Sequence, residues 1–114
     1  MNTSTLKILA VLSVFFGELL AVYAETFGVR SKLFSAEFWR IFIIMAIGGF
    51  FLILGYIVGY KAYQNLWIVA VVSITTLLIV EPLVILIFFN QTPSIGALIG
   101  FVLGVIGLIV ALFF

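Results

Sequence analysis

Residues 66–89 read LWIVAVVSITTLLIVEPLVILIFF, an apolar run in which Glu81 is the one charged residue. At about 1.5 Å per residue, a helix of this length crosses the roughly 30 Å hydrocarbon core of a bilayer. The alternation of polar and apolar residues that is typical of membrane β-barrels is absent. Because backbone amides in lipid must be paired within a segment or a closed barrel, the run predicts a transmembrane helix.

Three further apolar runs, at about residues 6–27, 38–60 and 95–114, have the same character. The whole chain is 67% hydrophobic and 8% charged, whereas soluble domains have about 25% charged residues. We therefore expect an all-α integral membrane protein, a single four-span domain over residues 1–114 that forms a four-helix bundle and a dimer. The alternative for residues 6–27, a cleaved signal peptide, is less favoured because the run exceeds the roughly 7–15 residues of a signal-peptide core.

The connections between the runs are short, so we expect consecutive helices to be antiparallel neighbours. Gly28 is expected to end the first helix in the left-handed conformation, and Ser35 to cap the second. Thr92 and Pro93 suit the N-cap and the first position of the fourth helix.

Basic residues lie near both ends of the expected bundle. Lys7 and Lys61 fall on the side of the N-terminus, and Arg30, Lys32 and Arg40 fall on the other. Since the distribution of Lys and Arg sets the orientation of membrane helices, this near balance permits insertion in both orientations and an antiparallel homodimer. A single topology with the first loop in the cytoplasm is an equally open alternative.

Acidic residues occur inside two of the runs. Glu18 lies near the middle of the first, in FFGELLAVYAE (residues 15–25), where a charge costs about 2.5–3.5 kcal/mol or more. Glu81 is expected at a similar depth, so the two acids are predicted to face one chamber, with Pro82 opening the helix beside them. Glu25 reaches the interface, where ordinary solvation explains it.

The buried acids lack a basic partner, because all five Lys and Arg residues fall near the ends of the spans. A carboxyl group in that position is expected to stay protonated until a cation or another carboxylate changes the balance, which indicates a proton carrier or a cation site. The structural alternative is a permanently protonated glutamic acid that hydrogen-bonds a neighbouring helix. Its conceivable partners are Ser13, Ser73, Thr75 and Thr76.

Small residues form a stripe on the last helix at spacings of four, four, three and four: Gly96, Gly100, Gly104, Gly107 and Ala111. Such stripes let membrane helices approach closely, and we expect a dimer contact here in preference to packing within the protomer. A similar stripe on the first helix comprises Ala10, Ser13, Gly17, Ala21 and Ala24.

Residues 62–110 resemble the last two helices of the small multidrug resistance family, four-span proteins of about this length in the drug/metabolite transporter superfamily. The matching residues are Phe88, Phe89, Gln91, Ala97, Ile99, Gly100, Leu103 and Gly107. Glu18 in GELL resembles that family's essential membrane carboxylate, which binds protons and cationic substrate alternately in an antiparallel dimer. The resemblance covers about two thirds of the chain and implies a prokaryotic inner or plasma membrane.

The chain departs from the family pattern in three places. The aromatic positions of the family's third helix fall on Ala70 and Ser73, the first helix lacks the usual tryptophan, and Glu81-Pro82 looks more like the EamA-like members of the superfamily. These differences indicate a divergent, single-repeat relative and argue against the family's usual multidrug substrates.

We therefore expect a dimeric transporter that exchanges protons for a cationic or amphiphilic small molecule. The predicted proton- and substrate-binding residues are Glu18, Glu81, Ser73, Tyr60 and Tyr63. Alternatives are a non-transporting accessory subunit of a larger membrane assembly and a component of a lipid or lipid-linked sugar flippase.

Other function classes are not expected. The chain has neither histidine nor cysteine, so we expect no enzymatic nucleophile-base pair, no metal site and no cofactor. A net charge of +1 without a basic patch argues against binding to nucleic acid.

Overall fold

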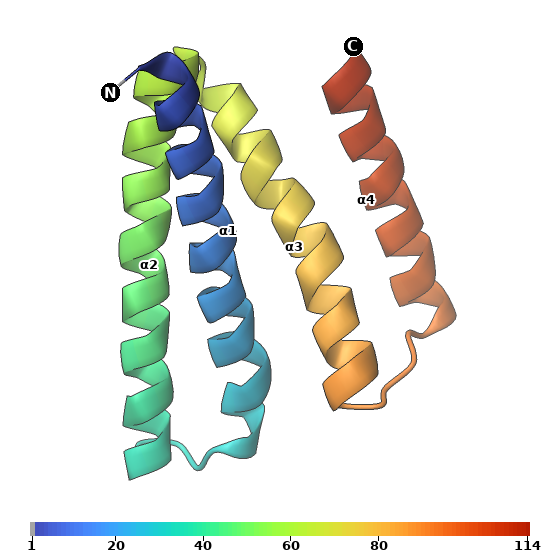
Figure 1. The fold of residues 1–114 in the computed structure, drawn as a ribbon. Helices are drawn as coiled ribbons and strands as arrows, with labels where there is room; N and C mark the ends of the chain where they lie inside the picture. Colours follow the sequence, from blue (N-terminus) through green and yellow to red (C-terminus); the bar gives the residue numbers. More distant parts are fainter. Residues whose placement is uncertain (1) are drawn as a thin grey trace.

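The computed structural model describes residues 2–114, which form four long α-helices and one short 3₁₀ turn (Figure 1). The helices are α1 (Thr3–Phe27), α2 (Ala36–Tyr63), α3 (Leu66–Phe88) and α4 (Ile95–Phe113), and the turn is η1 (Gly28–Arg30). All four helices are long and apolar enough to cross a membrane. The chain is therefore a multi-pass, all-α membrane protein, with its N- and C-termini at the same end.

Each helix begins at a side chain that accepts a hydrogen bond from the first turn. Asn2, Ser35, Asn65 and Ser94 accept from the backbone amides of Thr5, Phe38, Trp67 and Ala97, respectively. These caps satisfy amides that have no partner within their helix. The expected cap at Ser35 is confirmed, whereas α4 begins two residues later than Thr92 and Pro93 suggested.

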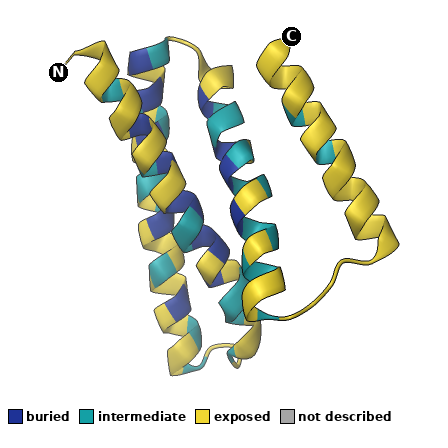
Figure 2. Ribbon diagram, turned by 45° about the vertical axis from the view of Figure 1, so that its right-hand side comes forward, coloured by how far each residue is buried: buried dark blue, intermediate teal, exposed yellow. Residues whose placement is uncertain are grey.

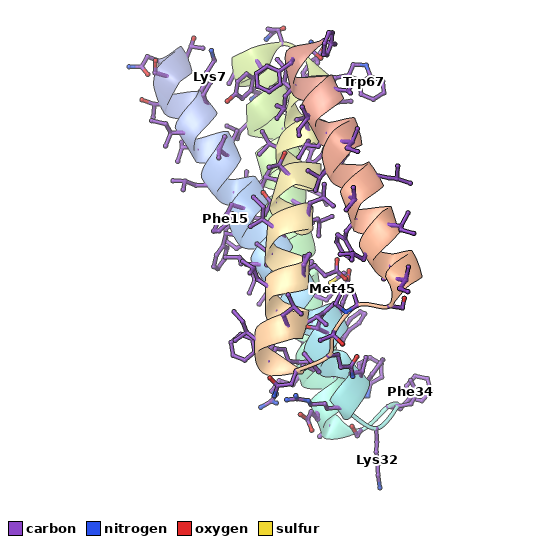
Figure 3. All side chains as sticks on the ribbon, turned by 90° about the vertical axis from the view of Figure 1, so that its right-hand side faces the viewer. Lys7, Phe15, Lys32, Phe34, Met45 and Trp67 are labelled. Atoms are coloured by element: carbon purple, nitrogen blue, oxygen red, sulfur yellow. The ribbon has the colours of Figure 1, made fainter. Side chains whose placement is uncertain are left out.

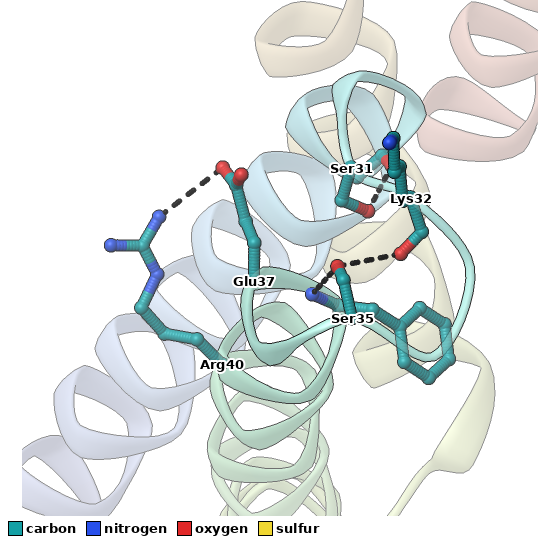
Figure 4. Close-up of polar contacts among 7 residues, drawn as sticks. Ser31, Lys32, Ser35, Glu37 and Arg40 are labelled. Atoms are coloured by element: carbon teal, nitrogen blue, oxygen red, sulfur yellow. Dashed lines mark hydrogen bonds and ion pairs between the residues drawn. The ribbon is translucent and has the colours of Figure 1, made fainter.

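The α1–α2 connection differs from expectation at Gly28. This residue is right-handed, with φ −61° and ψ −25°, and continues into η1. Ser31 closes that turn by donating from Oγ to the Gly28 carbonyl at 2.7 Å. The positive φ of 60° that reverses the chain occurs instead at Phe34. The next residue, Ser35, caps α2 by accepting a hydrogen bond from the Phe38 amide (Figure 4).

The helices α1 and α2 form the tightest contact in the molecule, through small residues. A Cβ placed on Gly17 would lie 2.9 Å from the Gly48 carbonyl oxygen, and one on Gly55 would lie 2.6 Å from a methyl group of Val14. Ala10, Gly17, Ala21 and Ala24 of the predicted α1 stripe are buried, while Ser13 is half-buried. The α1 stripe therefore packs within the protomer, against glycines of α2 that the sequence analysis did not single out.

Helix α4 stands apart from the other three (Figures 1 and 2). None of its residues is buried, and its contacts are with α3. The molecule is flat, with principal extents of 44, 35 and 18 Å. Large apolar side chains are exposed along every helix, as expected where the solvent is lipid. Figure 3 shows Lys7 and Lys32 at opposite ends of this apolar body.

Candidate functional site

The contact between α1 and α3 contains the most buried acid of the described chain. Glu18 is 5% exposed, and its Oε1 accepts a hydrogen bond of 2.5 Å from the Oγ of Ser73, which is itself 8% exposed. Val14 and Val22, one helical turn before and after Glu18, are almost completely covered. Glu18, the acid singled out in the sequence, therefore lies between α1 and α3 and is hydrogen-bonded to Ser73, which was also predicted as a site residue.

The neighbouring hydroxyl groups of α3 are engaged within their own helix. Thr75 and Thr76 donate to the carbonyl oxygens of Val71 and Val72, four residues earlier in each case. This bonding pattern is common for threonine in membrane helices. Ser73 is thus the α3 hydroxyl that reaches across to α1, and the other conceivable partners of Glu18 do not.

The second oxygen of Glu18, Oε2, forms no hydrogen bond with residues 2–114. It is nevertheless not fully covered, since every fully buried side-chain oxygen in this part of the chain has a partner. A carboxyl oxygen with remaining accessible surface is able to carry a proton or contact a cation. The Glu18 contact is therefore not completely closed.

No positive charge compensates Glu18 within the described residues. Lys7 lies over the ring of Tyr63, Arg30 over the rings of Phe27 and Phe89, and Arg40 pairs with Glu37 at 3.4 Å. Removing a carboxylate from water is costly, and at Glu18 no basic side chain of the described residues offsets that cost.

Glu81 lies in a different environment from Glu18. It is eight residues beyond Ser73, about 12 Å further along α3. There it lines a cavity of 240 Å³ together with Glu25, Thr26, Phe89 and Gln91. The expectation that Glu18 and Glu81 share a depth is therefore not met, because the register of α1 against α3 places Ser73 beside Glu18.

The predicted tyrosines lie far from Glu18. Tyr63 packs at the level of Lys7, which precedes Glu18 by eleven residues, or about 16 Å of helix. Tyr60 is 51% exposed on the outer surface of α2. The structure brings neither ring to the acid.

The glycine stripe of α4 is open in the protomer. A Cβ placed on Gly96, Gly100 or Gly107 would have no neighbour within 4 Å, and one on Gly104 would lie 3.5 Å from a methyl group of Leu78. Within one chain, therefore, no other helix packs closely against most of the α4 glycine stripe.

Two features of the site region were missed or discounted in the sequence. The spacing of Gly48, Gly55 and Gly59, seven and then four residues, is a helical stripe that predicts the α2 packing face. Glu25 was interpreted as an isolated interfacial acid, whereas it shares a cavity with Glu81. Its spacing of seven residues from Glu18 was the available signal.

Comparisons with protein-family models, curated proteins and solved structures give no match to this chain. The conclusions about function therefore rest on the geometry of Glu18 and its surroundings.

Proposed function

We propose that this protein is a small transporter that exchanges protons for a cationic or amphiphilic small molecule through Glu18. The observation that supports the proposal is that the two oxygens of the Glu18 carboxyl group lie in different environments. One oxygen is held by Ser73, and the other has accessible surface and no hydrogen-bond partner among residues 2–114. A group held in this way has a fixed position and a free site for a proton or a cation.

In the proposed cycle, the carboxylic acid of Glu18 releases its proton to the water on one side of the membrane. The resulting carboxylate keeps the hydrogen bond from Ser73 and binds the cation at Oε2. Return of a proton neutralises the carboxylate and releases the cation on the other side. Because one negative charge cannot stabilise both ligands fully, occupation by proton and by cation is mutually exclusive.

The proposal includes a dimer in which each subunit contributes Glu18 to a shared chamber. The protomer is only 18 Å thick along its shortest axis, and α4 has no buried residue. A second copy packed on the open α4 glycines would bury this surface and enclose the space beside α3. The near balance of basic residues at the two ends supports an antiparallel arrangement. The proposal places this dimer in a prokaryotic inner or plasma membrane.

Proton-driven flux in proteoliposomes tests the proposal. Glu18→Gln preserves an acceptor for Ser73 but cannot titrate, so coupled uptake should fall to the level of empty liposomes. Glu37→Gln is the matched control, since Glu37 is exposed and pairs with Arg40 at the start of α2. Unchanged coupled flux in Glu18→Gln would exclude the mechanism and favour a permanently protonated, structural Glu18.

A second candidate function is that of an accessory subunit in a larger membrane assembly. The largely exposed α4 favours it, because a different membrane protein is an equally suitable neighbour for its open glycines. Purification alone in mild detergent separates the two functions. A stable dimer supports the transporter, whereas a monomer that aggregates without another chain supports the accessory subunit.

A further inference from the structure

Two neighbouring cavities lie beside the C-terminal half of α3, and Glu18 lines neither of them. The larger, of 540 Å³, is an apolar groove between α3 and α4. Its walls include Leu78, Pro82, Ile85, Ala97, Phe101 and Val105. The smaller is the 240 Å³ cavity of Glu25 and Glu81 described above, which we call the acidic pocket.

The groove and the acidic pocket share two wall residues, Ile85 and Gln91. Helix geometry explains the arrangement, because Ile85 follows Glu81 by four residues and Pro82 by three. Ile85 is therefore the neighbour of both Glu81 and Pro82 on the surface of α3. Glu81 faces the acidic pocket on one side of this ridge and Pro82 faces the groove on the other. A ligand that lies across Ile85 contacts both cavities.

The carboxyl groups of the acidic pocket have no ion-pair partner within residues 2–114, where Arg40–Glu37 is the one ion pair. Arg30, the basic residue nearest to Glu25 in the sequence, lies against Phe89 at the wall of the pocket but forms no ion pair with Glu25 or Glu81. It donates to the Phe88 carbonyl oxygen at 3.2 Å, and its guanidinium lies 4.3 Å from the centre of the Phe89 ring. The pocket thus places two carboxyl groups that lack an ion-pair partner at the end of an apolar groove.

From this complementarity we infer that the groove and the acidic pocket together bind an amphiphilic organic cation, with its apolar tail between α3 and α4 and its cationic head between Glu25 and Glu81. The apolar walls match a hydrocarbon chain, and the combined size lies within the range of small-molecule sites. The inference rests on the proposed function for the later fate of the ligand, which would be transport past Glu18.

Binding of tritiated dodecyltrimethylammonium to the protein in nanodiscs of neutral lipid tests the inference. The expected result is saturable binding above that of empty nanodiscs, competed by unlabelled dodecyltrimethylammonium but not by dodecyl sulfate. Absence of saturable binding, or equal competition by dodecyl sulfate, would overturn the inference.

Variants separate the contribution of the head from that of the tail. We expect Glu81→Gln to weaken binding about tenfold and Glu25→Gln about threefold, since the exposed Glu25 is better screened by water.

Ala97→Phe should fill the groove and weaken binding of the twelve-carbon cation about tenfold. Val102→Phe, on the same helix but outside the groove walls and off the glycine stripe, is its control and should change binding less than twofold. Equal affinities in Glu25→Gln, Glu81→Gln and the unmodified protein would show that the acids do not hold the head.

Two further measurements make the result independent of folding and of transport. Glu81→Asp keeps the charge and should bind within about threefold of the unmodified protein, so a loss confined to Glu81→Gln does not reflect misfolding. Glu18→Gln lacks the transport site but should keep saturable binding of the cation at the two cavities, which a second change, Glu81→Gln, then weakens about tenfold, even though coupled flux is lost. Loss of binding in Glu18→Gln alone would assign the ligand to the Glu18 site and overturn the two-cavity site, while the proposed transport function would stand.

Discussion

Gly17 of α1 and Gly48 of α2 meet backbone to backbone. A Cβ on Gly17 would lie 2.9 Å from the carbonyl oxygen of Gly48, and a Cβ on Gly48 would lie 3.0 Å from that of Gly17. Backbone atoms cannot move aside as a flexible side chain can. This crossing holds α1 in place one residue before Glu18, so the position of the acid depends on two residues that have no side chain.

Adding a methyl group at this crossing should destabilise the protein. We expect Gly48→Ala to lower the free energy of unfolding by about 1–3 kcal/mol, because the helices must separate to accommodate it. Thermal unfolding in detergent, followed by circular dichroism, measures the change. Gly49→Ala on the same helix meets nothing within 4 Å and should be neutral or slightly stabilising, and equal loss in both variants would contradict the assigned packing.

Removing the hydroxyl group of Ser73 should leave Glu18 Oε1 without its donor. We expect Ser73→Ala to cost about 1–3 kcal/mol in stability and to slow coupled flux, because a buried acceptor loses its partner. Ser73→Thr, which keeps the hydroxyl group, should restore most of both. The control is Thr75→Val, since Thr75 bonds within α3 and makes no contact with Glu18. If Ser73→Ala retains full stability and flux, the hydrogen bond has neither role.

Substrate binding should release protons from the solubilised protein. Dodecyltrimethylammonium added to protein in weakly buffered solution with a pH indicator should produce a saturable acidification, because the cation displaces the proton of Glu18. Glu18→Gln should abolish this signal, whereas Glu37→Gln should preserve it. Proton release that persists in Glu18→Gln would assign the titrating group to another acid.

Enlarging the α4 glycine face should affect association more than folding. Leucine at Gly107 meets open space within the protomer, so Gly107→Leu should shift the unfolding temperature little. It should lower the dimer fraction measured by analytical ultracentrifugation in detergent at least threefold, because close approach of two α4 helices needs small residues. Val102→Leu, two residues beyond Gly100 and therefore on another face of α4, is the control. An unchanged dimer fraction in Gly107→Leu would remove the glycine stripe from the interface.

The four spans and the identity of the buried acid were predictable from sequence, because each depends on composition along a short segment. Hydrocarbon solvates apolar residues and excludes charge, so segment length and hydropathy locate α1 to α4, and Glu18 is conspicuous in its run. The structure starts α1 three residues before the expected Leu6 and extends α2 three residues beyond the expected Tyr60. Such differences fall at the membrane edge, where local capping sets the helix ends.

Only the tertiary structure decided which residues surround that acid. In lipid, the outer face of a helix is as apolar as the face that packs, so hydrophobic periodicity does not identify the contact. The pairing of Glu18 with Ser73, the meeting of Gly17 with Gly48, and the separation of Glu81 from Glu18 follow from helix register and small-residue fit. These depend on residues from different spans at once, and no single run of the sequence contains that information.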